Sequence, residues 1–207
     1  MNKSNWISFL IILLSLAFFW PQNTLASREG WYAEAGMVGA WDTRLGNSEG
    51  DATVLELGPG AHGAIGYNWG ALGVRPSFYY ANMDRELAGV NIPGGDENLF
   101  GGSLDLKIYF MDLIKGESND DDFCFPYLVF GIGGYHLDPG IRPASGGDPG
   151  FGGNIAIGTD LNVFEAITLG IETGIRPMLF FTDASGSNDT YDLYIFDFMA
   201  IFTVHFN

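Results

Sequence analysis

The last seventeen residues, YDLYIFDFMAIFTVHFN, alternate between two kinds of side chain. One set of alternate positions is aromatic or aliphatic throughout: Tyr194, Phe196, Phe198, Ala200, Phe202, Val204 and Phe206. The other set includes Asp197 and His205. Because successive side chains of a β-strand point to opposite faces, this period of two indicates a strand with one strongly apolar face. Such a face needs an apolar environment along its whole length, with Asp197 turned away from it.

The same alternation recurs in seven other segments, most of them about ten residues long. They span residues 31–41, 54–69, 74–80, 100–110, 125–137, 151–161 and 167–177. The contrast is clearest in 100–110, where Leu104 and Leu106 oppose Asp105 and Lys107. A series of such segments separated by turn residues is typical of transmembrane β-barrels.

Two segments need their faces assigned. In 125–137 the pattern sets Leu128, Phe130 and Ile132 against Tyr127 and Val129. In 167–177 the apolar, outward set is Ile167, Leu169, Ile171, Ile175 and Pro177. The opposite face of this last segment carries Thr168, Glu172, Gly174 and Arg176.

Composition favours a membrane barrel over a soluble fold. The chain is 47% hydrophobic, yet after residue 26 no apolar run approaches the ~20 residues of a membrane-spanning helix. A soluble lipocalin or β-sandwich would bury its apolar face and expose its charges. Here the apolar face continues from segment to segment, and the polar face mixes glycines with charges of both signs. We therefore predict an all-β fold, an eight-stranded antiparallel transmembrane barrel.

The connections between the segments alternate in length. Long polar connections cover 42–52, 83–98, 138–150 and 183–190, whereas Gly70-Ala71-Leu72 and the link before residue 167 are tight. Residues 112–122 are the exception to this alternation. Short periplasmic turns and long extracellular loops are expected in such barrels, so we predict an up-and-down meander with both termini in the periplasm.

The first 26 residues have the order of a secretory signal peptide. Lys3 is followed by an apolar stretch from Trp6 to Trp20 and by Thr24-Leu25-Ala26, which resembles a cleavage site. We predict cleavage after Ala26, which leaves a barrel domain of residues 27–207. The alternative, a transmembrane anchor, needs a longer apolar run.

Charge and cysteine content exclude some classes of function. The formal net charge of −16 at pH 7 argues against nucleic acid as a partner. Cys124 is the only cysteine, which excludes an intramolecular disulfide and a cysteine-based metal cluster. The acidic run Asp120-Asp121-Asp122 lacks the spacing of an EF-hand, so a solvated turn is favoured over a divalent-cation site. We predict no metal and no cofactor.

Four features together resemble a known family: the signal peptide, the strand series, the PYLVFGIGGY segment at 126–135 and the aromatic last strand. The chain is similar to the small eight-stranded outer-membrane barrels of Gram-negative bacteria, the OmpA/OmpX-like group with its OmpW-type relatives. The resemblance implies an outer-membrane location, contact with membrane lipid and lipopolysaccharide, and recognition of the last strand by the barrel-assembly machinery. The family's last strand usually ends on an aromatic residue, whereas here Asn207 follows Phe206.

The inner face of the predicted barrel carries most of the candidate site residues. They are Glu34, Glu56, His62, Arg75, Asp105, Lys107, Asp160, Glu172, Arg176, Asp197 and His205. An eight-stranded barrel is only wide enough for its own side chains, and a buried charge must be paired, so we predict a polar network that fills the lumen. For Asp197 the predicted partners are Arg75, Arg176 or Lys107. Alternatively, inward glycines leave a narrow path or pocket for a small hydrophobic molecule, as OmpW-like relatives are thought to provide.

Aromatic residues on the outer face predict two girdles at the membrane interfaces. Trp31 and Trp41 lie ten residues apart on one face, which at a strand tilt near 40° corresponds to ~25 Å across the membrane. The predicted girdle residues are Trp31, Trp41, Tyr67, Trp69, Tyr80, Phe110 and Phe206.

Enzymes that act on lipid A also use this architecture, so the three histidines are candidate catalytic residues. A nucleophilic mechanism needs a serine near a histidine and a carboxylate. None of His62, His136 and His205 is followed by serine two residues later, as the deacylase H-x-S pattern requires. We predict no catalytic residues. The predicted role is structural or surface-interacting, with a channel or binding barrel for small hydrophobic molecules second and a lipid A-modifying enzyme third.

Overall fold

A computed structural model describes residues 29–43, 57–83, 86–87, 90–91, 97–115, 124–139, 147–164, 166–182 and 189–206 of the chain. The predicted signal peptide, Glu56 and the acidic run Asp120–Asp122 lie outside the described residues. Those three predictions therefore remain predictions.

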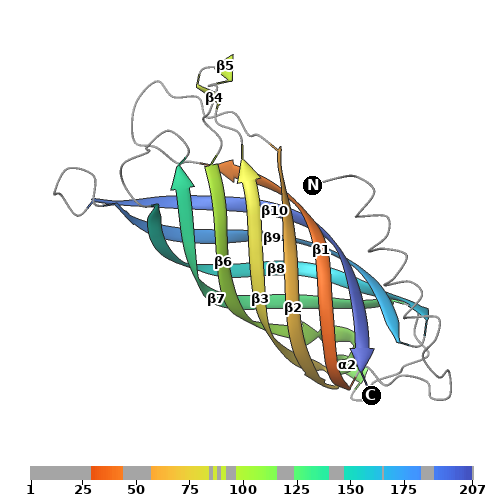
Figure 1. The fold of residues 1–207 in the computed structure, drawn as a ribbon. Coiled ribbons are helices and arrows are strands. Elements are labelled where there is room, and N and C mark those ends of the chain that lie inside the picture. Colours follow the sequence, from red (N-terminus) through yellow and green to blue (C-terminus); the bar gives the residue numbers. More distant parts are fainter. Residues whose placement is uncertain are drawn as a thin grey trace.

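Eight long strands close into one barrel (Figure 1). They are β1 (Gly30–Thr43), β2 (Leu57–Trp69), β3 (Leu72–Met83), β6 (Glu97–Tyr109), β7 (Cys124–Pro139), β8 (Asp148–Phe164), β9 (Ile167–Thr182) and β10 (Asp189–Phe206). Each strand pairs antiparallel with its neighbour along the chain, and β1 closes the ring by pairing with β10 from Trp31–Phe206 to Thr43–Tyr194. The short strands β4 (Glu86–Leu87) and β5 (Val90–Asn91) form a separate hairpin. The predicted eight-stranded meander is confirmed.

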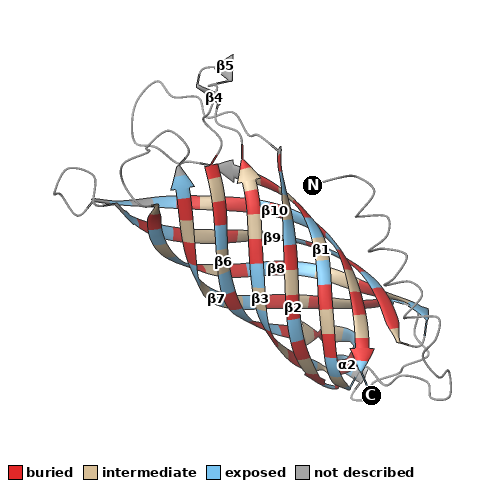
Figure 2. Cartoon of the chain, in the orientation of Figure 1, coloured by how far each residue is buried: buried red, intermediate tan, exposed pale blue. Residues whose placement is uncertain are grey.

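Burial alternates along the strands, as Figure 2 shows. In β10, Phe196 and Phe198 are exposed, whereas Ile195 and Asp197 are buried. The predicted phase of 125–137 is also confirmed, because Tyr127 and Val129 are buried while Phe130 and Ile132 are exposed. Large apolar side chains therefore line much of the described outer wall, and most charged side chains of the described strands face the interior.

Tight turns close one end of the barrel, which we call the C-terminal end because Phe206 lies there. Gly70, in the turn between β2 and β3, has a φ of 72°, a left-handed conformation that glycine adopts without a Cβ clash. The backbone N–H of Tyr109 donates a hydrogen bond of 2.8 Å to the carbonyl of Ala71 in the same turn. At the opposite end, which we call the loop end, the strands are longer than predicted. Residues 138–139 and 148–150, expected in a loop, belong to β7 and β8.

Two further expectations were wrong. Phe110 was expected at the end of a strand, but β6 ends at Tyr109 and Phe110 begins the helix α2 (Phe110–Lys115). An acidic residue in the first turn, Asp112, favours a helix start because it complements the unpaired backbone N–H groups. Ile167 was expected to be exposed on the outer face but is only 6% exposed. It follows the turn after β8, beside a register irregularity between Asn162 and Phe164.

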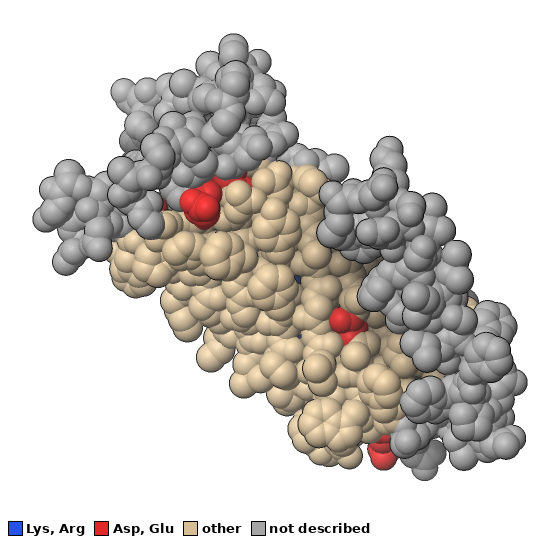
Figure 3. All heavy atoms as spheres, in the orientation of Figure 1, with Lys and Arg blue, Asp and Glu red and all other residues tan. Residues whose placement is uncertain are grey.

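Uncharged residues dominate the described wall of the barrel (Figure 3). Its most exposed apolar side chains include Met37 at 78% and Ile132 at 63%. No helix within the described residues is long and apolar enough to cross a membrane.

Candidate functional site

The polar side chains of the lumen gather around Arg75 of β3. Its guanidinium donates to Glu34 Oε2 at 2.7 Å, to Asp105 Oδ2 at 3.2 Å and to both carboxylate oxygens of Glu172 at 2.9 Å. These carboxylates come from β1, β6 and β9, and all four side chains are fully shielded from solvent. In the ring order β1-β10-β9-β8-β7-β6-β3-β2, strands β3 and β9 stand opposite each other. The Arg75–Glu172 pair therefore bridges the lumen.

Lys107 of β6 is the second cation of this network. Its Nζ donates to Asp160 Oδ2 at 2.8 Å and to Glu34 Oε1 at 3.2 Å, so Glu34 joins the two cations. The ammonium also lies 3.9 Å from the ring centroid of Tyr127, a distance typical of a cation–π contact. The Tyr109 hydroxyl donates to Asp160 Oδ2 at 2.7 Å. We call Glu34, Arg75, Asp105, Lys107, Asp160 and Glu172 the charged network.

Serine and histidine side chains border the charged network. The hydroxyls of Ser77 and Ser103 are 2.7 Å apart, and Ser103 Oγ donates to Asp105 Oδ1 at 2.8 Å. His62 Nε2 lies 3.5 Å from Glu34 Oε2, and neither ring nitrogen is hydrogen-bonded within the described residues. The serine hydroxyls therefore hydrogen-bond to each other and to Asp105 rather than to His62. The buried carboxylate beside His62 is that of Glu34. This is not the geometry of a serine nucleophile activated by a histidine.

Asp197 forms a separate ion pair with Arg176. Arg176 Nε donates to Asp197 Oδ2 at 2.6 Å, and the guanidinium carbon lies 4.2 Å from the centroid of the Tyr79 ring. Both charged side chains are almost fully buried. Of the three partners predicted for Asp197, the structure selects Arg176, whose strand β9 pairs directly with β10.

Tyrosine rings occupy the space that inward glycines leave. A Cβ built on Gly66 would overlap the ring of Tyr32, and one on Gly158 would lie 2.5 Å from the Tyr127 hydroxyl and ring. Tyr32 and Tyr127 are 1% and 0% exposed. At these positions glycine makes room for a ring, which favours a filled lumen over an open path.

The half of the lumen towards the loop end is filled differently. A contiguous cluster of buried residues there contains Val38, Ala40, Tyr79, Ala81, Met83, Leu99, Tyr135, Leu137, Met178, Phe180, Leu193, Ile195, Met199 and Ile201. Phe180, Leu193, Ile195 and Met199 are each 0% exposed. We call these fourteen residues the apolar cluster; the Arg176–Asp197 pair lies among them, since Ile195 and Met199 flank Asp197 on the inner face of β10. The residues predicted from sequence as candidate site residues are the charged residues and histidines of the inner face, although the apolar inner residues of β10 follow from the same period of two.

Strand pairing is interrupted at two prolines. The β2–β3 pairing runs as far as Ala64–Ser77 and resumes at Tyr67–Val74, beside Pro76. The β8–β9 pairing likewise skips from Gly152–Met178 to Ile155–Ile175, beside Pro177. Proline has no N–H to donate to a neighbouring strand, which accounts for the two missing residue pairs at each of these places.

Several predicted girdle residues lie together on the outer wall at the C-terminal end. Trp31 and Tyr67 have ring centroids 5.3 Å apart, and those of Tyr67 and Trp69 are 4.9 Å apart. Phe206 is 42% exposed at the same end, as the register pair Trp31–Phe206 requires. The remaining predicted members, Trp41 and Tyr80, lie near the loop end, where the Tyr80 hydroxyl donates to Asn98 Oδ1 at 2.8 Å.

Within the described residues, no group of histidine, cysteine and acidic side chains has the arrangement of a metal site.

Comparison with known proteins shows the fold. No family model and no curated protein sequence matches the chain. Among solved structures, Neisserial surface protein A (NspA) is similar with a TM-score of 0.61 and 14% identity, over 86% of this chain and 98% of that one. The outer membrane protein OprG from Pseudomonas aeruginosa is similar with a TM-score of 0.55 and 12% identity, over 89% of this chain and all of that one. The fold of small outer-membrane β-barrels, predicted from the sequence, is confirmed.

Proposed function

We propose that this chain is an outer-membrane barrel with a structural or surface-interaction role and with a lumen sealed by its charged network. The termini lie in the periplasm, and membrane lipid and lipopolysaccharide surround the wall. The barrel-assembly machinery recognises the aromatic last strand during insertion. The observation that carries the sealed lumen is the bonding of Arg75 to carboxylates from three other strands, one of them opposite its own.

Two independent contacts cross the lumen and support this seal. Arg75 reaches Glu172 on the far strand, and Lys107 of β6 reaches Glu34 of β1. These contacts support a barrel interior that at this height is occupied by ion pairs rather than by a channel. An ion that passed through would have to displace a buried cation from its carboxylates, and leaving a buried charge unpaired costs about 3–5 kcal/mol.

Conductance across planar lipid bilayers tests the seal. We expect purified full-length protein to give no stable unitary conductance, and Arg75→Ala to give none either, because the apolar cluster still occupies the other half of the lumen. Gel mobility with and without heating shows whether each variant is a folded barrel before it is measured. Steady conductance by the folded wild-type protein would contradict the proposal.

A second candidate function, binding of a small hydrophobic molecule, is favoured by the apolar cluster. Half of the lumen is lined by aliphatic and aromatic side chains, and the β8–β9 pairing is interrupted beside Pro177 at the same height as Met178. A ligand bound in this half would contact apolar side chains and would not cross the charged network. This role is compatible with a sealed C-terminal end.

Ligand-dependent stability tests this second role. A ligand that binds only the folded barrel stabilises it by an amount that grows with the logarithm of ligand concentration above the dissociation constant. We expect unfolding of the wild-type protein by heat in detergent to shift upward with a medium-chain alkane, and Leu193→Asn, which places an amide in the apolar cluster, to abolish the shift. An unchanged melting curve for the wild type at saturating alkane would contradict the binding role, and only the structural role would remain.

A further inference from the structure

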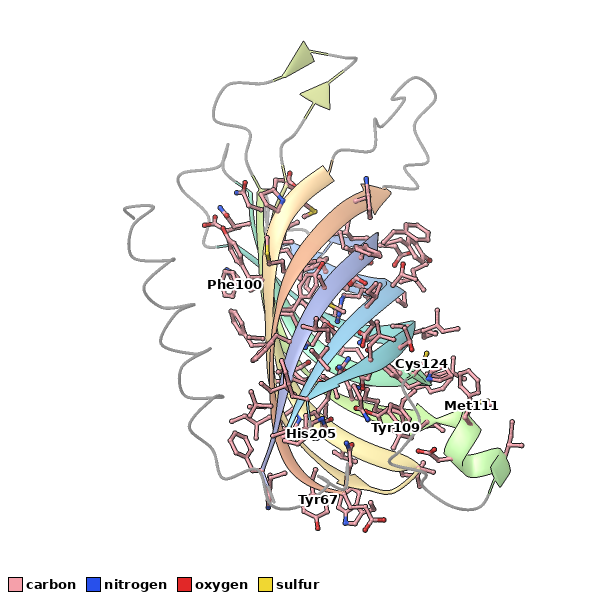
Figure 4. The ribbon with its side chains drawn as sticks, turned by 90° about the vertical axis from the view of Figure 1, so that its right-hand side faces the viewer. Tyr67, Phe100, Tyr109, Met111, Cys124 and His205 are labelled. Atoms are coloured by element: carbon pink, nitrogen blue, oxygen red, sulfur yellow. The ribbon has the colours of Figure 1, made fainter. Side chains whose placement is uncertain are left out.

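The helix α2 presents an unpartnered apolar face at the C-terminal end of the barrel. Ile114 is 77% exposed and Met111 is 39% exposed, whereas Asp112 between them is 3% exposed. Residues three apart lie on one face of a helix, so Met111 and Ile114 point the same way and Asp112 points towards the barrel. The helix packs against β6 and β7. Figure 4 shows it projecting sideways from the wall, with Met111 turned away from the strands.

The height of α2 on the wall follows from the strand register. Trp69 pairs with Leu72, and Leu72 pairs with Ile108, so these three residues stand side by side across β2, β3 and β6. Helix α2 begins two residues after Ile108. It therefore starts near Trp69 in the strand register, and the Trp69 ring centroid lies 4.9 Å from that of Tyr67 on the outer wall.

The exposed tryptophan and tyrosine residues at this level cover only one side of the barrel. Trp31, Tyr67 and Trp69 lie on β1 and β2. Strands β6 to β9 contain no tryptophan, and their three tyrosines are all buried: Tyr109, Tyr127 and Tyr135. The wall next to α2 therefore lacks the amphipathic rings that hold a barrel at the membrane interface.

We propose that α2 lies in the headgroup layer of the phospholipid leaflet at the C-terminal end, with Met111 and Ile114 inserted among the acyl chains. The helix thereby takes the place of the aromatic girdle on the β6–β9 side. Its apolar face continues the apolar outer wall, where Leu106 is 38% and Leu104 is 56% exposed on the adjoining strand. Amphipathic helices bind membranes in this orientation, parallel to the surface. The inference rests on the proposed membrane location of the barrel.

Spin labels at single cysteines test the depth of α2. Cys124 is free and exposed, and Cys124→Ser keeps a hydroxyl in place of the thiol that lies 3.0 Å from Thr159 Oγ1. In this background we compare Ile114→Cys with Leu104→Cys, a reference on the outer wall, and with Asp192→Cys, an exposed reference near the loop end. The full chain is reconstituted in phosphatidylcholine vesicles, and collision rates with oxygen and with a water-soluble nickel chelate are measured.

We expect the oxygen-to-nickel ratio at position 114 to be several-fold above that at 192 and to approach that at 104. A ratio at 114 equal to that at 192 overturns the interfacial helix while leaving the barrel in the membrane. Protection at 114 from both reagents also overturns it, because that result indicates a protein partner or a second copy. A water-like ratio at 104 contradicts the proposed membrane location itself.

A matched pair of substitutions tests whether the apolar face holds the helix in lipid. With the label at Met111→Cys, Ile114→Asp should lower the oxygen-to-nickel ratio several-fold, because a carboxylate draws the helix into water. Ile114→Leu should leave the ratio unchanged. Equal ratios for the two variants overturn the proposal.

Discussion

The two halves of the lumen are filled by different kinds of interaction. Towards the C-terminal end, directional ion pairs join strands that are not neighbours, as Arg75 of β3 does with Glu34 of β1 and Glu172 of β9. Towards the loop end, the side chains of the apolar cluster occupy the space through van der Waals packing. The charged half fixes which residues meet, because a buried charge has few acceptable partners. The apolar half requires only that the volume be filled.

This difference predicts unequal tolerance to substitution. In the charged half, removing one charged side chain leaves its partners with fewer opposite charges. Single substitutions should therefore destabilise the barrel strongly, and substitutions of both partners only mildly. In the apolar half, apart from the Arg176–Asp197 pair, the cost of a substitution should follow the volume removed and depend little on a second site. The predictions below test this contrast, from the largest expected effect to the smallest.

Arg75→Leu should destabilise the barrel most. The substitution leaves Glu34, Asp105 and Glu172 without their shared guanidinium, and breaking a buried charge network costs about 3–5 kcal/mol. Urea unfolding in lipid vesicles measures the change. Arg176→Leu is the matched control, because it removes a cation from one carboxylate instead of three. An equal loss for both arginines would contradict the central position of Arg75.

Gly158→Ala should follow, with a loss of about 1–3 kcal/mol from overpacking. A Cβ at this position lies 2.5 Å from the Tyr127 hydroxyl, and Tyr127 is held beneath Lys107. Gly134→Ala is the matched control, since a Cβ there meets no atom within 4 Å. Unfolding midpoints of the two variants give the comparison. If Gly158→Ala is as stable as Gly134→Ala, the lumen has free space beside Tyr127.

The inner and outer faces could be predicted from sequence, whereas the partners inside could not. The period of two separates Phe196 from Asp197 because the two faces of each strand meet different environments. The partner of Asp197, Arg176 rather than Arg75 or Lys107, depends on the strand register and on the stagger of the closed barrel. Neither can be read from the sequence of a single strand. Helix α2 was missed because its six residues continue a strand pattern through Phe110 and are too few to show a helical period.

The Arg176–Asp197 pair should show strong coupling within the apolar cluster. Arg176→Met and Asp197→Leu each strand one buried charge, whereas the double substitution leaves none. Coupling between contacting residues is typically about 0.5–3 kcal/mol, and here the double variant should recover most of what the single variants lose. A double-mutant cycle by urea unfolding measures this value. Additive losses would mean that each charge has another partner that holds it.

Ile195→Val should have the smallest effect, about 0.5–1.5 kcal/mol. Ile195 is 0% exposed beside Asp197 on the inner face of β10, and the change removes one methylene without touching a polar group. Its effect should add to that of Arg75→Leu, because the two side chains belong to different halves of the lumen and share no contact partner within the described residues. Urea unfolding of the single and double variants tests this additivity. Strong coupling would show that the two halves form one cooperative unit, in which the apolar packing depends on the ion pairs that bridge the barrel beneath it.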